Sequence, residues 1–559
     1  MNDQVQSLKK KGIPAAAIHA GQSLKKRSEI LHKAYRKEIK LLYVSPERFA
    51  LSDYPWYENL PIDLIAIDEA HCISQWGHDF RPAYKKLSLL REAFPKVPII
   101  ALTATATPLV KQDIINTLTF REGYKVFETS VYKENLSISV VSSSWWYEHL
   151  LAVLKNLKSG GALVYARSRT KTEELASWLR KYGVNAEFYH AGLKWEERKE
   201  KQDKWLKGEV PVMVCTTAFG MGIDKPDVRI VMHIDLPEDP ESYLQEIGRA
   251  GRDGKHSYAI LYATQNARVD LLKKISNIPD LDTVRKIYDY LCSHLKISYG
   301  EGQDKAFVFN PERFIQLYKI NPFVLIEALK ILNIAGYIEL EGDMKTKALV
   351  KVTVSREELY KFRVEHPKWD RFIDTLVRLN PGIMDRRVPL RLGVLAKALS
   401  TSTEAINEAL MRLHKYGIVE YVPPKQGTML VFLKDRVPSP QLTFPVEELR
   451  RIYSLKKKRA KWMIHFSYEL KDCRMQHLAT YFNPQDASRK CNKCDNCLND
   501  VSLAKKKILN LLRSVKRPMT AGQIAGQLIP MNEQVITTAL EQLVAADSLK
   551  VVKNRYFSI

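Results

Sequence analysis

Short apolar runs alternate with amphipathic segments over residues 1–265. In one amphipathic segment, Leu175, Leu179 and Tyr182 recur at the spacing of a single helix face. The apolar runs that predict strands span residues 39–44, 62–67, 97–102, 161–165, 210–215, 228–234 and 258–262. Strands that alternate with helices in this way predict parallel α/β sheets. The stretch near 125–150 shows no clear periodicity, so we expect it to join two such lobes.

After about residue 280, helices are followed by short β-rich segments, and a motif repeats. Each copy has a helix with one Ala and two Leu on one face, then a turn residue, then a β-rich segment. The copies begin at Ala328, Ala409 and Ala539. Two copies end in predicted hairpins, which pair residues 419–422 with 429–433 and residues 549–552 with 556–559. This order is the winged-helix plan, and three unrelated helical hairpins with similar cores are the alternative.

The formal net charge is +24 at pH 7 over 559 residues. Such a charge favours a polyanionic partner, most simply nucleic acid, although it would also suit a membrane surface. No apolar run approaches the ~18 residues that span a bilayer, and no export signal is visible at the start. Seven cysteines, four of them clustered, argue against a disulfide framework. We therefore expect a reducing compartment, the cytoplasm or a eukaryotic nucleus, and no membrane partner.

Two adjacent carboxylates, Asp68 and Glu69, directly follow the apolar run 62–67. A buried strand that ends in such a pair is how P-loop NTPases hold Mg²⁺ and polarise the attacking water. The partner motif, G-x-x-x-x-G-K-[ST], is absent from the sequence. We therefore expect these 559 residues alone to hydrolyse ATP poorly or not at all.

The segment that follows the carboxylates mixes aromatic residues with polar ones. Trp76, Phe80 and Arg81 could stack on bases and bind a phosphate, and stacking contributes ~1–3 kcal/mol per base. A core-filling role is the alternative, which the interleaved Gly, His, Asp and Pro disfavour. Thr103 and Thr105 follow the predicted strand 97–102, where their hydroxyls could bond to the acidic pair or to phosphate.

Two arginines, Arg249 and Arg252, lie three residues apart, on one face of a predicted helical turn. Arginines so placed can stabilise a transferring phosphoryl group across a cleft. A surface charge cluster is the alternative for the pair alone.

Four cysteines form the pattern C-x17-C-x2-C-x2-C: Cys473, Cys491, Cys494 and Cys497. Four thiolates satisfy a closed, structural Zn²⁺ site. An iron–sulfur cluster and a disulfide pair are the second and third interpretations. The other three cysteines, Cys72, Cys215 and Cys292, are expected to be small buried hydrophobic residues.

Taken in order, these segments resemble those of RecQ-family DNA helicases, members of helicase superfamily 2. The most specific likeness runs from Asp68 to Pro82 and matches the family's second motif and aromatic-rich loop at nearly every position. Residues 44–48, 102–107, 217–224 and 245–254 resemble the other helicase motifs in the expected order, and the cysteine cluster resembles the family's zinc-binding subdomain. The family's phosphate loop has no counterpart here. Arg252 and Cys473 also lie farther apart than in the common family layout, and two winged-helix candidates fill the gap.

The resemblance implies ATP, Mg²⁺ and Zn²⁺ as cofactors, and single-stranded, duplex and branched DNA as partners. Asp68 would hold Mg²⁺, Glu69 would polarise water, and Arg249 and Arg252 would act as arginine fingers. The implied sets are completed by His71 and Gln245 for catalysis and by Gly222 and Asp224 for the nucleotide. The implied DNA contacts are Gln75, Trp76, His78, Phe80, Arg81, Thr103 and Thr105.

The sequence thus predicts an α/β fold in which two RecA-like parallel-sheet lobes precede a helical zinc-binding subdomain and winged-helix domains. The predicted bounds are 1–135 and 136–268 for the lobes, 269–355 and 356–440 for two winged-helix-like domains, 441–500 for the zinc-binding subdomain, and 501–559 for a last winged-helix-like domain. The implied function is ATP-dependent 3′-to-5′ DNA unwinding in recombination and repair. A non-catalytic DNA-binding protein and a winged-helix transcriptional regulator are the alternatives.

Overall fold

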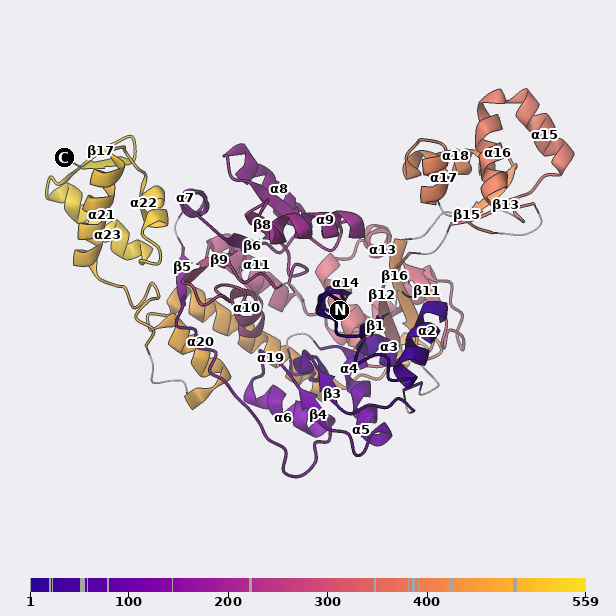
Figure 1. The fold of residues 1–559 in the computed structure, drawn as a ribbon, viewed down its shortest axis with the longest axis horizontal. Helices are drawn as coiled ribbons and strands as arrows, with labels where there is room; N and C mark the ends of the chain where they lie inside the picture. The colour runs from indigo at the N-terminus through magenta and orange to yellow at the C-terminus, as the bar shows by residue number, and fades with distance from the viewer. Residues whose placement is uncertain are drawn as a thin grey trace. The chain divides into compact units, whose positions relative to one another are not determined.

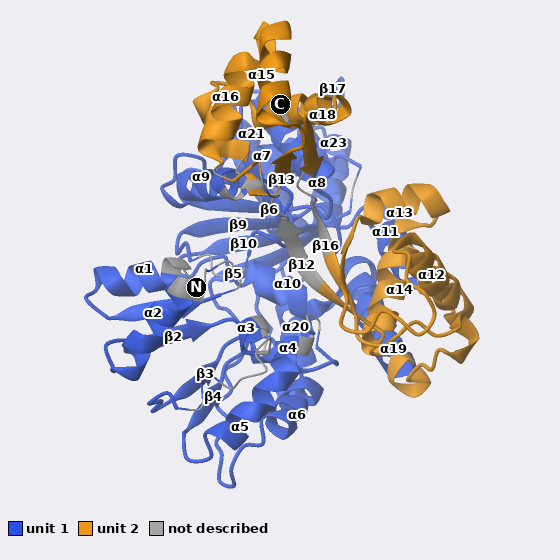
Figure 2. Ribbon diagram, turned by 90° about the vertical axis from the view of Figure 1, so that its right-hand side faces the viewer, with its two compact units in different colours: residues 1–275, 450–559 blue, residues 276–449 orange. Residues whose placement is uncertain are grey.

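The fold is described by a computed structural model (Figure 1). It describes residues 2–19, 22, 24–50, 56–57, 59–77, 80–142, 144–220, 224–345, 348–380, 382–384, 388–390, 392–422, 426–485 and 490–558. The chain divides into two compact units (Figure 2). Unit 1 joins residues 1–275 to 450–559, and unit 2 is the intervening segment 276–449. No helix among the described residues is both long enough and apolar enough to cross a bilayer.

The second lobe of unit 1 is built on a six-stranded parallel sheet. Its strands are β5 (Leu136–Val141), β6 (Gly161–Tyr165), β7 (Ala186–Tyr189), β8 (Val212–Cys215), β9 (Val228–His233) and β10 (Ser257–Tyr262), in the order β5-β10-β9-β6-β8-β7. The accompanying helices are α7 (Trp146–Lys155), α8 (Arg169–Lys181), α9 (Trp195–Leu206), α10 (Pro240–Ile247) and α11 (Gln265–Ser276). Leu163 and Val164, adjacent on β6, are both fully buried, but in different core clusters. Both faces of the sheet are therefore covered, as in α/β proteins generally.

The first lobe has two shorter parallel strand pairs. Strand β1 (Ala15–Ile18) pairs with β2 (Leu41–Val44), and β3 (Ile65–Ile67) pairs with β4 (Ile99–Ala101). The helices of this lobe are α1 (Asn2–Lys10), α2 (Leu24–Tyr35), α3 (Pro46–Ala50), α4 (Pro82–Lys85), α5 (Leu89–Ala93) and α6 (Pro108–Thr117). A short 3₁₀ turn, η1 (Ala70–Ile73), follows β3 and is buried throughout. The strands predicted in both lobes are confirmed, most of them one to three residues shorter.

Unit 2 contains two separate three-stranded antiparallel sheets. One has the order β11-β16-β12 and the other β14-β13-β15. The strands are β11 (Ala306–Phe309), β12 (Ile338–Lys345), β13 (Ala348–Val352), β14 (Val388–Leu390), β15 (Val419–Val422) and β16 (Gln426–Phe432). The helices are α12 (Leu281–His294), α13 (Pro311–Tyr318), α14 (Pro322–Ile334), α15 (Arg356–Glu365), α16 (Asp370–Leu379), α17 (Leu392–Ala398) and α18 (Thr403–Lys415).

The pairing within unit 2 contradicts the predicted hairpin of residues 419–422 with 429–433. Instead, β15 pairs with β13 through Val419 and Val352, and β16 pairs with β12 through Phe432 and Ile338. Residues 348–422 are therefore a domain inserted between β12 and β16 of another. The predicted boundary at residue 355 falls inside these inserted residues, just after β13. Two β-rich runs around a short polar turn usually indicate a hairpin. Here each run pairs instead with a strand that lies much earlier in the chain.

The cysteine-bearing segment and the C-terminal domain complete unit 1. The long helix α19 (Val446–Ile464) ends in a π-helical turn, and α20 (Arg474–Phe482) precedes the cysteine loop. The C-terminal domain contains α21 (Val501–Val515), α22 (Ala521–Gln527), α23 (Glu533–Ala545), β17 (Leu549–Val552) and β18 (Arg555–Ser558). Strands β17 and β18 pair from Leu549 with Ser558, so the predicted C-terminal hairpin is confirmed.

Candidate nucleotide, DNA and zinc sites

The acidic pair lies at the carboxyl end of β3. Asp68 is exposed, and Glu69 takes a left-handed backbone conformation with φ 49°, which turns the chain out of the strand. The Glu69 amide donates to Asp68 Oδ1 at 2.9 Å, and the Tyr84 hydroxyl donates to the Asp68 carbonyl at 3.3 Å. Backbone bonds from Leu102 to Ile67 and from Ala70 to Leu102 hold this turn beside the end of β4. Both carboxylates thus stand at the sheet edge where α/β proteins bind ligands.

His71 connects the acidic pair to the threonine-rich loop after β4. Its side chain is almost completely buried, and Nδ1 lies 3.0 Å from Thr103 Oγ1 and 3.4 Å from Glu69 Oε2. Thr103 is exposed, as a DNA contact requires. Thr105 is buried, and its amide donates to Thr103 Oγ1, so the structure does not place its hydroxyl at a DNA-binding surface.

The aromatic-rich loop follows η1 and is only partly exposed. Trp76 packs against the first-lobe core, and the ammonium of Lys85 lies 5.4 Å from the centre of the Phe80 ring. A Cβ at Gly77 would come within 2.7 Å of the His71 carbonyl oxygen, so the tight turn requires glycine. Gln75 and Arg81 are half-buried, and the predicted contact His78 lies outside the described residues.

Arg459 of α19 links the aromatic-rich loop to the second lobe. Its guanidinium donates to the Trp76 carbonyl, and its Nε lies 2.9 Å from Glu241 Oε1 at the start of α10. Tyr481 of α20 donates to the same carboxylate oxygen at 3.0 Å. Burial lowers the pKa of Arg459, but Glu241, Tyr481 and Asp239 together outweigh it, so the pKa is raised overall. This role could not be predicted, because Arg459 ends a run of basic residues that resembles a solvent-exposed helix face.

The two arginines of the second lobe hold the loop that follows β8. Arg249 is buried, and its Nη1 donates to the Gly220 carbonyl at 2.5 Å. Arg252 Nη1 lies 2.8 Å from Asp224 Oδ1. Gly222, between these two anchors, lies outside the described residues. Helix α10 ends at Ile247, so the arginines lie in turns beyond the helix and not on a helical face, contrary to the prediction.

Other groups around these arginines are tightly constrained. Gln245 is half-buried on α10, next to Glu246, whose carboxylate lies 2.7 Å from His233 Nε2. Lys133 donates to the Gly248 carbonyl at 2.8 Å, and burial, with Arg252, lowers its pKa. The described contacts of Arg249 and Arg252 lie within the second lobe, so their opposition to the acidic pair stays a prediction.

The four predicted cysteines come together. Their Sγ atoms all lie within 4.8 Å of one another, and those of Cys491 and Cys497 are 3.9 Å apart. Tetrahedral zinc with bonds of about 2.3 Å requires sulfur atoms about 3.8 Å apart, so this set fits Zn²⁺. Hydrogen bonds with Cys491 and Cys494 lower the pKa of the Cys473 thiol. The hydrogen bonds with Cys473 raise the pKa of Cys491 and Cys494, so a bound cation would be what stabilises these two as thiolates.

Asp495, which forms a buried ion pair within the zinc-binding segment, also hydrogen-bonds the cysteine loop to the second lobe. Arg474 Nε lies 2.6 Å from Asp495 Oδ1, and both side chains are almost completely buried. Asp495 Oδ2 accepts a hydrogen bond from the Val140 amide at 2.9 Å, and the Asp495 amide donates to the Ile138 carbonyl at 3.1 Å. The cysteine loop therefore bonds directly to β5.

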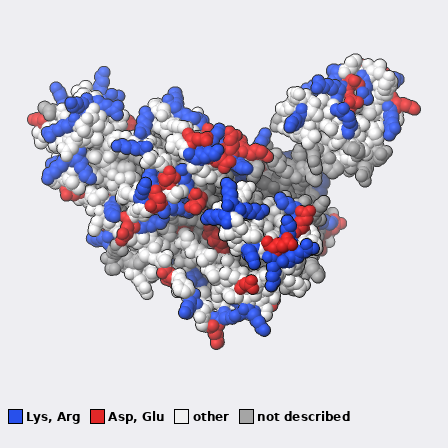
Figure 3. Space-filling view, viewed as in Figure 1, with Lys and Arg blue, Asp and Glu red and all other residues white. Residues whose placement is uncertain are grey.

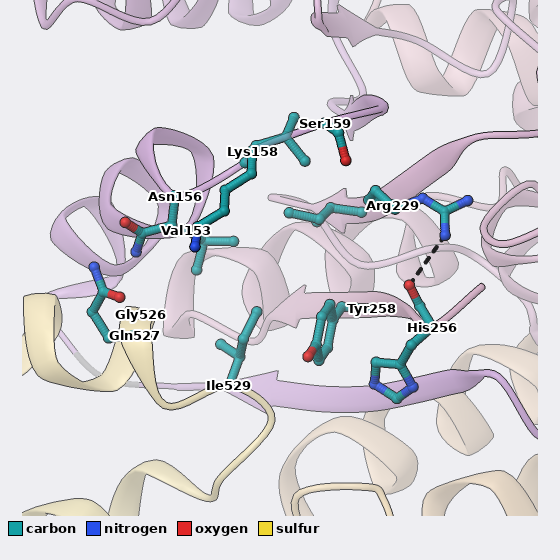
Figure 4. Close-up of a pocket in the computed structure, with 12 residues that line it drawn as sticks. Val153, Asn156, Lys158, Ser159, Arg229, His256, Tyr258, Gly526, Gln527 and Ile529 are labelled. Atoms are coloured by element: carbon teal, nitrogen blue, oxygen red, sulfur yellow. Dashed lines mark hydrogen bonds between the residues drawn. The ribbon is translucent and has the colours of Figure 1, made fainter. Parts of the chain in front are cut away.

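A cavity of about 230 Å³ lies between the second lobe and the C-terminal domain (Figure 4). Val153 of α7, Arg229 of β9, Tyr258 of β10 and Ile529 line it, and Arg229 donates to the His256 carbonyl at 3.3 Å. Arg229 and Tyr258 stand at the beginnings of their strands. Parallel sheets bind ligands at the opposite edge, so this cavity is not the candidate nucleotide site.

Four family models match successive parts of the chain. They are DEAD/DEAH box helicase over residues 1–113, helicase conserved C-terminal domain over 146–254, RecQ helicase winged-helix domain, Bacteroidota, over 350–423, and RecQ zinc-binding over 447–498. The first two define a helicase core of two RecA-like lobes. With the last two, they show that the chain belongs to the RecQ family of helicases. The zinc-binding match also favours zinc over the iron–sulfur and disulfide alternatives.

Relatives from several bacteria are similar in sequence. The ATP-dependent DNA helicase RecQ of Pasteurella multocida is 41% identical over 263 residues, which are 47% of this chain and 42% of that protein. RecQ of Bacillus subtilis is 40% identical over 299 residues, 52% of this chain and 50% of that protein. The probable ATP-dependent DNA helicase RecS of the same organism is 42% identical over 330 residues, 55% of this chain and 64% of that protein. The matches thus span about half the length of these relatives.

Proposed function

We propose that this chain forms most of the motor of an ATP-dependent 3′-to-5′ DNA helicase that unwinds duplex and branched DNA in recombination and repair. The observation that carries the proposal is the acidic pair at the end of β3, joined through buried His71 to Thr103 at the end of β4. The helicase family models and the RecQ relatives support it. Such an enzyme works where DNA is, in the bacterial cytoplasm or a eukaryotic nucleus.

In this proposal the first lobe carries the hydrolytic groups. Bound ATP and Mg²⁺ would supply the phosphoryl group and the cation that neutralises its charge. Asp68, exposed beyond β3, would hold the cation, and Glu69 would orient the attacking water and accept its proton. His71 contacts both Glu69 and Thr103, so it would hold the Glu69 carboxylate in place relative to the DNA-facing loop.

The second lobe would contribute positive charge to the transition state. Arg249 is bonded to Gly220 and Arg252 to Asp224, so each must exchange that partner before it reaches a phosphate. Gln245, Gly222 and Asp224 would complete the nucleotide contacts from this side. We infer that exchange of the two arginine contacts accompanies closure of the lobes on the nucleotide.

DNA contact would begin at the aromatic-rich loop. Partly exposed Trp76 and Phe80 can stack on bases, Arg81 and Thr103 can bind phosphate, and Gln75 and His78 would complete the set. Arg459 bonds the backbone of this loop to α19, so movement of the loop on DNA would reach the zinc-binding subdomain directly.

We assign these proposed roles to separate domains of the chain. The lobes would be residues 1–135 and 136–268, the zinc-binding subdomain 441–500 and the last winged-helix domain 501–559. The two intervening winged-helix domains are nested, because residues 348–422 interrupt the sheet of the other.

The decisive experiment is strand displacement by the natural full-length protein, on duplexes with a 3′ or a 5′ single-stranded tail. We expect unwinding only from the 3′ tail, and a loss of about 100-fold or more in Glu69→Gln, because a positioned base contributes ~10²–10⁴-fold. Glu92→Gln, which changes an exposed carboxylate of the same lobe, is the matched control and should unwind normally. Equal unwinding by Glu69→Gln and the parent protein would falsify the assignment.

A non-catalytic DNA-binding protein is the second candidate, and the C-terminal domain favours it. Residues 501–559 contain nine Lys and Arg against three Asp and Glu. The exposed cations are Lys506, Lys507, Arg513, Lys516, Arg517, Lys550, Lys553 and Arg555, and more blue than red is visible on this domain at the left of the view (Figure 3). DNA binding without any ATP-dependent unwinding would favour this candidate. A sequence-specific regulator would leave the two lobes without a role.

A further inference from the structure

A chain of aromatic rings joins three helices of the inserted domain, residues 348–422. The Phe362 ring of α15 lies 4.6 Å from His366 and 6.0 Å from Tyr416, measured between ring centres. Trp369 lies 6.5 Å from Tyr416 and 5.9 Å from Phe372. We call these five residues the ring cluster. It gathers where α15 turns into α16 and where α18 ends.

Only part of the ring cluster is buried in the domain core. Phe362, Trp369 and Phe372 pack against that core but stay half-exposed. Tyr416 contacts two other rings and yet is 58% exposed, and His366 is exposed as well. Rings that only filled a core would be more deeply buried. The outer faces of these rings are therefore available to a flat, apolar ligand.

Positive charge surrounds the ring cluster. Lys368 lies between His366 and Trp369 in the sequence, Lys415 directly precedes Tyr416, and both are exposed. The exposed cations Lys361, Arg371 and Arg412 lie on the same three helices, and none of these five cations forms an ion pair among the described residues.

Acidic groups near the ring cluster are partly neutralised. Arg363 lies 2.6 Å from Asp370 and 3.8 Å from Asp374, so these two carboxylates are already paired. Glu365, beside His366, is exposed, and so are Glu357 and Glu358 of α15 and Glu408 of α18. Over residues 348–422 as a whole, thirteen Lys and Arg outnumber nine Asp and Glu, so the net charge still favours an anion as the ligand.

We propose that the ring cluster and its lysines bind single-stranded nucleic acid. Stacking needs exposed base faces, which a single strand offers and a duplex conceals, and the flanking cations suit its phosphates. The family match to residues 350–423 identifies the domain as a winged helix and does not assign a function to the ring cluster. The proposed site shares no residue with the acidic pair of the first lobe and needs no ATP, so it goes beyond the proposed helicase activity.

The test is photocrosslinking of the full chain to a single-stranded oligonucleotide that carries 5-iodouracil, followed by mass spectrometry of the peptides. We expect crosslinks on peptides that contain Trp369 or Tyr416. Tyr416→Ala should reduce their yield about 5-fold or more, the equivalent of about 1 kcal/mol of stacking. Tyr360→Ala is the matched control, because Tyr360 is 69% exposed in the same domain but outside the ring cluster, and it should leave the yield unchanged.

Three results would overturn the proposal. The first is crosslinks confined to residues 1–275, which would leave the helicase proposal intact. The second is equal losses in Tyr416→Ala and Tyr360→Ala, with circular dichroism showing that both variants are folded. The third is equal competition by unlabelled duplex and single strand, because bare electrostatic attraction would then explain the binding. Glu69→Gln should leave these crosslinks unchanged, which separates this site from the helicase activity.

Discussion

The cysteine loop and the inserted domain are attached to the rest of the molecule in opposite ways. Cys473, Cys491 and Cys494 belong to the same buried cluster as the second-lobe sheet, and Asp495 bonds directly to β5. The inserted domain has a core of its own, drawn from residues 348–421, and the chain enters and leaves it between β12 and β16. Buried contacts thus make the cysteine loop part of the second lobe, whereas the inserted domain is built to be separable.

The largest expected effect is on the folding of unit 2, in two deletions that test whether the inserted domain is separable. Replacement of residues 346–425 by a short Gly/Ser link from Lys345 to Gln426 should keep the β12–β16 pairing and leave the rest of unit 2 folded. Removal of 356–440, the domain bounded by sequence alone, takes away β16 with its buried Leu430 and Phe432 and should unfold unit 2. Circular dichroism and limited proteolysis of both deletions check this. Equal protease resistance in the two would contradict the nested arrangement.

Features that depend on local contacts could be predicted from the sequence, and features that depend on distant contacts could not. The zinc site was predictable because its four ligands carry their own spacing, and most strands were predictable because apolar runs are local. The hairpin at 419–433 was wrong, because the partner of Val419 is Val352 and no local pattern shows so distant a partner. Strand β5 was missed because its two serines, Ser137 and Ser139, interrupt the apolar run although both are buried, whereas the equally buried β6 has an unbroken apolar run.

Whether a single site residue could be predicted also depends on whether its contacts are local or distant in the chain. Asp68 and Glu69 were predictable from a strand and its next two residues. Arg459 was not, because its burial depends on Glu241 and on the Trp76 carbonyl, both distant in the chain. The engagement of Arg249 and Arg252 within their own lobe likewise depends on a loop fold that spacing alone does not reveal.

Loss of the metal should come next in size. In Cys494→Ser, or after treatment with a strong chelator, we expect bound zinc to fall from one per chain to near zero. Structural zinc contributes on the order of 10 kcal/mol in small domains, so the melting temperature of unit 1 should fall as well. Elemental analysis and calorimetry measure both quantities. Cys292→Ala, at a buried cysteine of unit 2, should keep its zinc, and full zinc content in Cys494→Ser would argue against the four-cysteine site.

A smaller effect on the free energy of unfolding is expected when one ion pair is removed from each of the two regions. Arg474→Met leaves Asp495 buried without its partner and should lower the free energy of unfolding by about 3–5 kcal/mol. Arg363→Met removes a surface pair with Asp370 on the inserted domain and should cost at most about 1 kcal/mol. Urea titration of both variants checks the contrast. Addition of Asp495→Asn to Arg474→Met should recover part of the loss, since it removes the unpaired charge. Similar losses in the two single variants would mean that the cysteine loop is no more firmly attached than the inserted domain's surface.

The smallest effect is a pH dependence that belongs to unit 1. Burial lowers the pKa of His149 to about 4, and its Nδ1 lies 3.0 Å from the Tyr262 hydroxyl in the second-lobe core. An unfolded histidine titrates near 6.5, so the unfolded chain binds more protons between pH 6.5 and 4. Stability from this neutral histidine is therefore complete above pH 6.5 and is lost as the pH falls towards 4, by roughly 3 kcal/mol. Urea titrations of unit 1 at pH 7.5 and 4.5 should show a smaller acid loss in His149→Gln than in the parent chain, while the transition of unit 2 stays the same in both. An acid loss equal in the two chains would mean that His149 is not held neutral by the second-lobe core.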